Sequence, residues 1–68
     1  MIMQPVSSSN LVSVGYDKPS RTLRIQFNSG TYDYYDVPEY VYNGLMAAAS
    51  KGSYHASYIK NSYRYSRI

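Results

Sequence analysis

The C-terminal segment, residues 51–68, combines positive charge with aromatic rings and contains no acidic residue. Cations spaced along a chain can bind successive phosphates, and exposed aromatic rings can stack with the bases of single-stranded nucleic acid. Basic residues and tyrosines are interleaved in this segment, as both contacts require. The pattern therefore predicts RNA binding, and the candidate contacts are Lys51, Tyr54, Lys60, Tyr63, Arg64, Tyr65 and Arg67.

A protein-binding role is the competing hypothesis for the same segment. The formal net charge of +3 is low for a dedicated nucleic-acid-binding protein, and basic residues beside packing tyrosines also occur in proteins without such a role. Tyr and Arg are enriched at the energetic centres of protein interfaces, and an exposed sheet edge can pair with a partner strand. The expected partner is thus RNA or, alternatively, a protein, with a homo-oligomer as a variant of the second hypothesis.

Residues that could catalyse a reaction or bind a metal are few. The chain has no cysteine, which excludes thiolate zinc sites and nucleophilic thiols. His55 is the only histidine, and Asp33, Asp36 and Glu39 suit turn, edge and helix-cap positions better than a pairing of nucleophile and base. The spacing of the four glycines matches no phosphate-binding loop. We therefore expect a domain that is not an enzyme and has no metal or cofactor.

Length and terminal composition set further limits. A chain of 68 residues makes one domain, and a domain of this size buries only about 60% of the surface of its unfolded chain. Pro5 and the serines at positions 7–9 precede any patterned segment, which predicts a flexible arm over residues 1–9 and a single domain over residues 10–68. No apolar run reaches the roughly 20 residues of a membrane span, and the first residues lack signal-peptide features. We expect a cytoplasmic protein without membrane attachment.

Three segments alternate apolar and polar residues with the period of a half-buried β-strand, and they cover residues 11–17, 22–28 and 31–37. Between the last two, Ser29 and Gly30 suit a two-residue hairpin turn, since glycine readily adopts a positive φ. That turn would place Phe27 opposite Tyr32 and Ile25 opposite Tyr34. Both tyrosines would then lie on the apolar face of the sheet.

A helical pattern follows the third strand. It begins near Pro38 and places Val41, Leu45 and Ala48 on one face. Gly52 is a typical residue at a helix C-terminus, and Ser53 could cap a second, shorter helix that extends to about Lys60. Residues 61–68 alternate again and could form an edge strand of the sheet.

These elements predict an α+β fold: a three-stranded antiparallel β-meander with a packed α-helix, then a short second helix and a basic C-terminal tail. One face of the sheet would be covered by the first helix. The expected core consists of Val12, Val14, Leu23, Ile25, Phe27, Tyr32, Tyr34, Val41, Leu45, Ala48 and Ile59.

An ordered set of residues supports this fold by resemblance. The set consists of Ser8-Ser9-Asn10, Gly15-Tyr16-Asp17, Leu23, Ile25, Phe27, Gly30, Tyr32-Asp33-Tyr34, Val37-Pro38, Tyr42, Leu45, Ser50-Lys51-Gly52, Tyr54, Ile59 and Tyr63. In this order the residues resemble the KTSC domain, which occurs at the C-terminus of some lysyl-tRNA synthetases and as single-domain bacterial and phage proteins. The resemblance implies no established activity, although RNA binding has been suggested for the family. One departure is His55-Ala56, where the family favours an aromatic residue and an amide.

Overall fold

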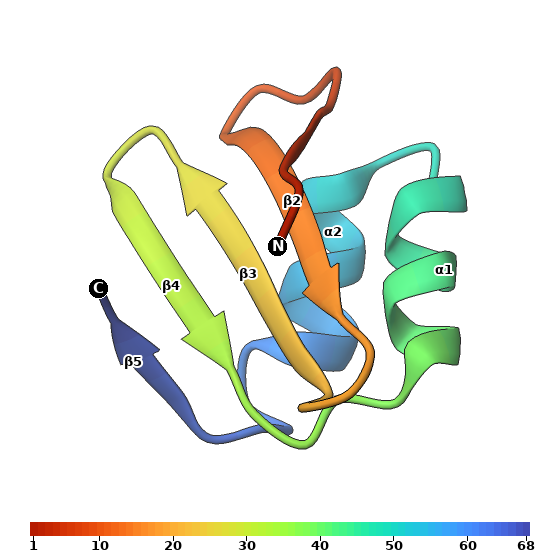
Figure 1. The fold of residues 1–68 in the computed structure, drawn as a ribbon. Coiled ribbons are helices and arrows are strands. Elements are labelled where there is room, and N and C mark those ends of the chain that lie inside the picture. The colour runs from red at the N-terminus through yellow and green to blue at the C-terminus, as the bar shows by residue number, and fades with distance from the viewer.

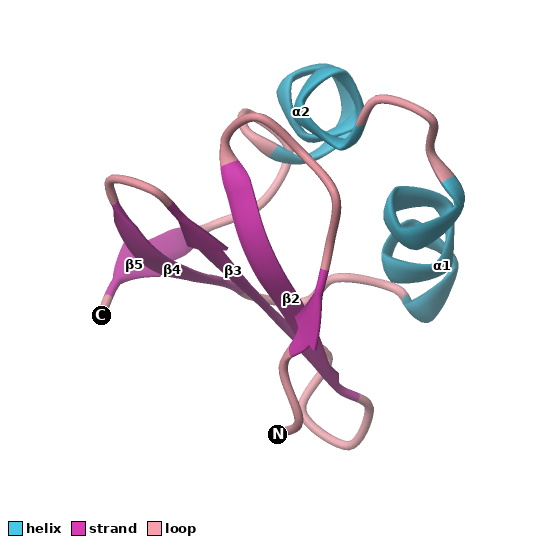
Figure 2. Cartoon of the chain, turned by 90° about the horizontal axis from the view of Figure 1, so that it is seen from above, coloured by secondary structure: helices cyan, strands magenta, loops and turns pink.

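The computed structural model describes residues 1–68 and shows a five-stranded antiparallel sheet with helices on one of its faces (Figure 1, Figure 2). The strands follow the chain in the order β1-β2-β3-β4-β5. The elements are β1 (Gln4–Pro5), β2 (Leu11–Asp17), β3 (Thr22–Phe27), β4 (Gly30–Tyr34), α1 (Glu39–Ala47), α2 (Lys51–Tyr54), the π-helical turn η1 (His55–Ile59) and β5 (Tyr65–Arg67). The predicted α+β class is confirmed, but the predicted sheet has three strands and the observed sheet has five.

The two additional strands lie at the edges of the sheet. β5 pairs with β4, with Tyr65 opposite Tyr34 and Arg67 opposite Tyr32, so the edge strand predicted for the tail is confirmed. β1 pairs with β2, with Gln4 opposite Val14. Strands of two or three residues are too short to show an alternating pattern, which is why the sequence did not reveal β1. The division into an arm over residues 1–9 and a domain over residues 10–68 stays a prediction.

The β3–β4 hairpin turns one position earlier than predicted. Phe27 pairs with Gly30, Ile25 with Tyr32 and Leu23 with Tyr34. The predicted pairing was therefore wrong by two residues, because Asn28 and Ser29 form the turn and Gly30 begins β4. Since side chains alternate with a period of two, a shift of two residues leaves every side chain on its predicted face.

A β-bulge in β2 reverses one predicted core position. Leu11 pairs with Phe27 and Ser13 with Gln26, so two residue steps in β2 match one step in β3. Leu11 is consequently 2% exposed and belongs to the core, whereas Val12 is 41% exposed. The prediction that Val12 is a core residue was wrong, since simple alternation does not take account of the extra residue.

The remaining core prediction is largely confirmed. Phe27 and Tyr32 are only partly buried, although both pack against the core. Ala48 is also only partly buried because it lies beyond the last turn of α1. Val37, at the start of the connection to α1, is fully buried and was not predicted. The buried cluster consists of Leu11, Val14, Leu23, Ile25, Tyr34, Val37, Val41, Leu45 and Ile59.

The boundary between the helices differs from the prediction. α1 ends at Ala47 because Ala48 is extended, and Ser50 begins the next helix by accepting a hydrogen bond from the backbone N–H of Ser53. Gly52 therefore lies inside α2 and does not terminate α1, and Ser53 is not the cap. None of the helices has the length and apolar character needed to cross a membrane.

Candidate nucleic-acid interface

The alternation of β5 divides the C-terminal candidates between the two faces of the sheet. Tyr65 and Arg67 stand opposite Tyr34 and Tyr32 and share their face, which is the face that carries the helices. Arg64 lies on the other side, with its guanidinium 5.5 Å from the centre of the Tyr35 ring. The C-terminal segment therefore does not form one continuous binding track.

A groove lies beside Tyr65. Figure 2 shows α1 and α2 over the β2 and β3 side of the sheet, while β4 and β5 extend beyond them. The groove has a volume of about 370 Å³. It is lined by Phe27, Ser29, Tyr32, Tyr34, His55, Lys60, Asn61 and Tyr65. Strands and helix therefore both contribute to its walls.

Five of the eight residues that line the groove carry aromatic rings. The Tyr65 ring centre lies 5.9 Å from that of Tyr32 and 5.7 Å from that of Tyr34. Phe27 meets the His55 ring edge to face at 4.8 Å. Tyr65 nevertheless remains 58% exposed. An exposed ring over buried rings is a surface on which another flat ring can stack.

A buried polar pair forms the floor of the groove. The Tyr34 hydroxyl lies 2.8 Å from His55 Nε2, and Tyr34 is only 4% exposed. Burial, with smaller contributions from Tyr32 and Tyr65, raises the pKa of Tyr34 to about 12. Burial and the nearby charge of Lys60 lower the pKa of His55. Both groups are therefore uncharged at neutral pH, so the floor can hydrogen-bond without carrying charge.

Two cations border the groove without a carboxylate partner. The three ion pairs of the structure use Lys18, Arg24 and Arg64, so neither Lys60 nor Arg67 has a carboxylate partner and both can attract an external anion. Arg67 donates a hydrogen bond from Nη2 to the carbonyl of Ser29 at 2.8 Å, and its guanidinium lies 5.9 Å from the centre of the Tyr32 ring.

Gly30 makes room for the Arg67 guanidinium. Its φ is +153°, and a Cβ at this position would lie 2.8 Å from Arg67 Nε. Any larger residue would therefore be strained and would also push the guanidinium away from Ser29 and Tyr32.

The other predicted contacts serve packing or lie elsewhere. Lys51 Nζ donates to the Ala48 carbonyl at 3.0 Å. The Tyr54 ring lies 4.8 Å from that of Tyr58. Tyr63 packs against the core, and burial raises its pKa. The structure thus brings together Lys60, Tyr65 and Arg67 and separates them from Lys51, Tyr54, Tyr63 and Arg64.

Six groove residues were absent from the predicted set of contacts: Phe27, Ser29, Tyr32, Tyr34, His55 and Asn61. Their sequence signal was partial. The alternation does place Phe27, Tyr32 and Tyr34 on one face, which we interpreted only as core. Nothing in the sequence pairs β5 with β4, and that pairing is what turns the edge of the core into a groove.

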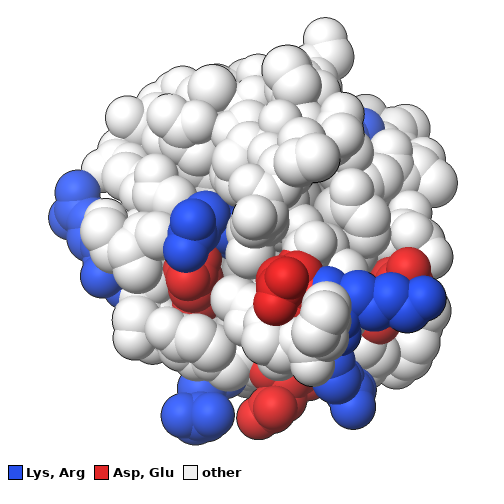
Figure 3. All heavy atoms as spheres, in the orientation of Figure 1, with Lys and Arg blue, Asp and Glu red and all other residues white.

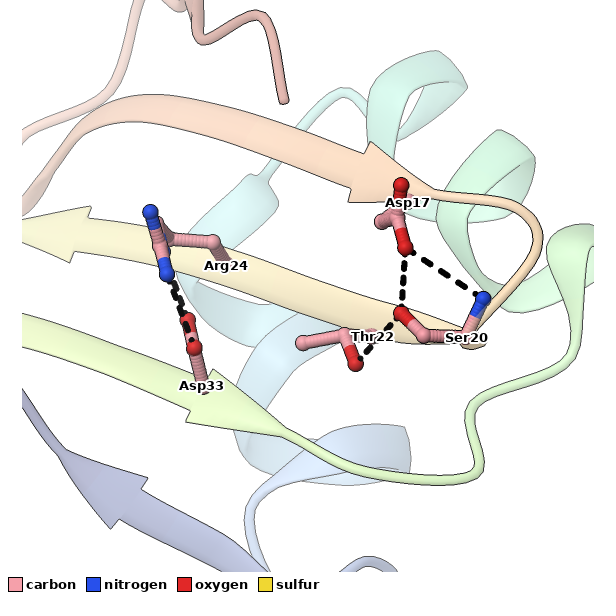
Figure 4. A network of polar contacts seen from close by, with 5 residues as sticks. All are labelled: Asp17, Ser20, Thr22, Arg24 and Asp33. Atoms are coloured by element: carbon pink, nitrogen blue, oxygen red, sulfur yellow. Dashed lines mark hydrogen bonds and ion pairs between the residues drawn. The ribbon is translucent and has the colours of Figure 1, made fainter.

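The opposite face of the sheet is unsuited to a phosphate track. Figure 3 shows this face, and its basic and acidic residues are intermixed. Arg24 and Asp33 point toward each other from neighbouring strands, with Nε–Oδ1 and Nη2–Oδ2 distances of 2.7 Å and 3.0 Å (Figure 4). Nearby, the Asp17 carboxylate accepts a hydrogen bond from the Ser20 hydroxyl. These carboxylates would repel a polyanion.

The chain is similar to several known proteins. The sequence profile of the KTSC domain matches residues 7–63. A protein of Tsukamurella paurometabola is 41% identical over 63 residues, which make up 91% of this chain and 94% of that protein. A lysine-tRNA ligase of Trichormus variabilis is 37% identical over 54 residues, but these are only 10% of the ligase. The crystal structure of a KTSC domain protein from Yersinia pestis matches with a TM-score of 0.97 and 44% identity, covering 98% of this chain and 96% of that one.

Proposed function

This chain belongs to the KTSC domain family, and we propose that it is a small non-enzymatic domain that binds single-stranded RNA through its basic, tyrosine-rich C-terminal segment. The observation that carries this proposal is the meeting of Lys60, Tyr65 and Arg67 at one aromatic groove. No carboxylate lines that groove. An exposed ring between unpaired cations is the combination with which proteins bind unpaired bases and their phosphates.

The similarity to a lysine-tRNA ligase favours the same ligand class, since that relative is named for a tRNA. The match covers one tenth of the ligase, so the activity of the whole enzyme is not transferred to this domain. RNA in a single-stranded state is favoured over a duplex, because the bases of a duplex are already stacked and paired and cannot offer a face to an aromatic side chain.

Fluorescence anisotropy with a labelled, mixed-sequence RNA of about eight nucleotides tests the proposal. We expect saturable binding that weakens log-linearly with salt, with a slope of about −0.7 for each phosphate neutralised. Engagement of Lys60 and Arg67 together predicts a slope near −1.4, and Lys60→Ala should reduce its magnitude by about 0.7. An absence of saturable binding even at about 50 mM salt would refute the proposal.

Two matched variants test whether losing an exposed lysine or tyrosine anywhere on the surface weakens RNA binding. Lys18 has a side chain that is 76% exposed, and Tyr40 is 73% exposed on α1. Neither contributes to the groove. Lys18→Ala and Tyr40→Ala should bind RNA as the unmodified chain does. If they weaken binding as much as Lys60→Ala and Tyr65→Ala, the interaction is not localised at the groove.

A protein partner is the alternative, and the edge position of β5 is the observation that favours it. No strand follows β5 in the sheet, so its outward backbone groups can pair with an added strand. Such binding would depend little on salt and would survive Lys60→Ala. If the chain does not bind RNA but does bind a protein, and that binding depends little on salt or survives Lys60→Ala, the alternative is favoured.

A further inference from the structure

We propose that the groove holds a single nucleotide unit, with its base stacked on Tyr65 and its phosphate bound by Lys60 and Arg67. This inference rests on the proposed function in its ligand class, but it goes further in assigning one site and three roles. The unit could be a free nucleotide or one nucleotide of an RNA strand, because the two share the same ring and phosphate. The experiment below separates these sources.

The size of the groove limits its occupant. Its volume of about 370 Å³ is near the lower end of the range of about 300–1,000 Å³ for small-molecule sites. That space admits one ring system with its sugar, and the remainder of a strand would have to leave the groove. Proteins that bind one base in this way remove it from its stack and enclose it between aromatic side chains.

The rings of the groove are arranged to receive a flat ligand. Tyr65 is tilted by 38° from Tyr34 and by 60° from Tyr32, so these rings do not stack face to face with one another. The 58% of Tyr65 that remains exposed is therefore available to an added ring. A ligand ring here would contact Tyr65 and would cover the edges of Tyr32 and Phe27.

The charges near the groove favour an anion beside that ring. Arg67 is held in place by its bond to the Ser29 carbonyl and by the Tyr32 ring. Lys60 lines the groove and is exposed at the end of η1, so its ammonium can move to meet a phosphate. The four Asp and Glu side chains are all engaged elsewhere, three in ion pairs and Asp17 in the β2–β3 turn.

His55 supplies the polar contact that would read the base. Its Nε2 is bonded to the Tyr34 hydroxyl, whereas Nδ1 has no hydrogen-bond partner and is not completely buried, although the residue as a whole is only 9% exposed. When the hydroxyl donates to Nε2, the imidazole proton lies on Nδ1 and can donate to a carbonyl oxygen or ring nitrogen of a base. Asn61 adds an amide that can both donate and accept.

The test is an NMR titration of the full chain with four nucleoside monophosphates and, separately, with ribose 5-phosphate and a short single-stranded RNA. We expect saturable shifts centred on His55, Lys60, Asn61 and Tyr65 with the monophosphates, and at least tenfold weaker binding of ribose 5-phosphate. Equal affinity for ribose 5-phosphate would show that only the phosphate binds and would overturn the proposal. An absence of groove shifts would overturn it as well.

The arms of the titration separate this proposal from the proposed function. RNA binding with shifts outside the groove would overturn the single-nucleotide site and leave RNA binding intact. Binding of monophosphates without binding of the strand would support the site and refute the strand as its ligand. Shifts at the groove with both ligands would support both proposals.

Variants of Tyr65 test the stacking role. Tyr65→Ala should weaken nucleotide binding roughly 5- to 150-fold, the range expected for loss of one base–aromatic stack. Tyr65→Phe keeps the ring and should bind within about twofold of the unmodified chain. If both variants bind alike, the ring does not stack with the base. Because Tyr65 lies on an edge strand, unchanged backbone spectra outside β5 are the control for folding.

Discussion

Tyr34 and His55 are joined across the interior by a contact of 2.8 Å between the tyrosine hydroxyl and the imidazole Nε2. One residue belongs to β4 and the other begins η1, so the contact ties the sheet to the π-helical turn that follows α2. Burial favours the uncharged form of each group, which raises the pKa of Tyr34 and lowers the pKa of His55. The pair should therefore make the fold sensitive to both acid and alkali.

The free energy of unfolding should fall as the pH decreases from about 7.5 to about 5.5, because of His55. The pKa of His55 is lowered by burial in the folded chain, so the unfolded chain binds its proton first. Protonation then favours the unfolded state, and the stability contributed by neutral His55 is lost on acidification. Denaturant titrations at several pH values measure this slope.

His55→Gln controls for the acid effect, since His55 is the only histidine of the chain. Glutamine keeps a polar group near the Tyr34 hydroxyl but does not titrate. The variant should show a nearly flat stability profile over the same range of pH. An unchanged slope in the variant would show that the acid sensitivity comes from another group.

Alkali should also weaken the fold, and Tyr34 is the reason. Its pKa is raised to about 12, above the value of about 10 in an unfolded chain. The stability contributed by the neutral phenol is complete below about pH 10 and is lost as the pH rises toward 12. The loss should amount to about 2–3 kcal/mol by pH 12, as measured by denaturant titration.

Tyr34→Phe separates this effect from general alkaline unfolding. The variant keeps the buried ring but leaves His55 Nε2 without its partner, which should cost about 1–3 kcal/mol at neutral pH. Its stability should then vary less between about pH 10 and pH 12 than that of the unmodified chain. Equal pH dependence in both chains would contradict the assignment.

In β3 and β4 the face of each residue could be predicted from the sequence, but its partner could not. Alternation places Tyr32 and Tyr34 beside Ile25 whichever two-residue turn is used, because the alternatives differ by an even shift. Residue type favoured Ser29-Gly30 as the turn, but in the structure Gly30 begins β4, where its lack of a side chain makes room for Arg67. The bulge at Val12 also depends on tertiary packing and not on local residue type, because it allows both Leu11 and Val14 to reach the core.

The candidate site was predicted only in part because it depends on contacts between distant segments. The C-terminal charge and tyrosines were visible in the sequence, and Lys60, Tyr65 and Arg67 do meet at the groove. The contribution of His55 required knowing that η1 lies against β4, and no local pattern encodes that contact. Tyr54 and Tyr63 belong to the same basic segment but pack against the core, because tyrosines in such a segment can equally point inward.

The bulge in β2 predicts opposite effects for two neighbouring residues. Leu11→Ala should destabilise the fold by about 2–4 kcal/mol, because it creates a cavity at a fully buried position. Val12→Ala should change stability by less than about 1 kcal/mol, because Val12 is 41% exposed. Thermal or denaturant unfolding of the two variants measures both values. A larger loss for Val12→Ala would show that the strand is regular and lacks the bulge.

Gly44 is predicted to resist the usual stabilising replacement of a helical glycine. A Cβ at this position would overlap the Tyr54 hydroxyl and lie 2.8 Å from Tyr54 Cζ. Gly44→Ala should therefore destabilise by about 1–3 kcal/mol despite a gain in helix propensity of about 1 kcal/mol. Denaturant unfolding should show the opposite sign for Asn43→Ala, an exposed position in the same helix.

A chain that lacks the Tyr54 ring tests whether contact with this ring causes the loss of stability in Gly44→Ala. In a chain that carries Tyr54→Ala, the ring is absent and Gly44→Ala should become neutral or stabilising by up to about 1 kcal/mol. Should the penalty persist without the ring, the contact between Gly44 and Tyr54 is not its source.

The Arg24–Asp33 pair should be worth more than an ordinary surface ion pair. Its two hydrogen bonds are 2.7 Å and 3.0 Å long, and the Asp33 side chain is 11% exposed. The bond to Asp33 also raises the pKa of Arg24. Arg24→Ala should cost about 1–2 kcal/mol, between the values of exposed and buried pairs, because it leaves a partly buried carboxylate without a partner.

Replacing both members of the pair tests whether the cost comes from their coupling. Thr at both positions removes the stranded carboxylate and suits neighbouring strands, so Arg24→Thr with Asp33→Thr should be more stable than Arg24→Thr alone. The difference should persist at about 1 M salt, since the stranded Asp33 carboxylate is partly buried and is screened less than an exposed charge. Denaturant unfolding of the two single variants and the double variant supplies the coupling energy. Strictly additive losses would show that the two side chains contribute independently and that the bidentate geometry adds nothing to stability.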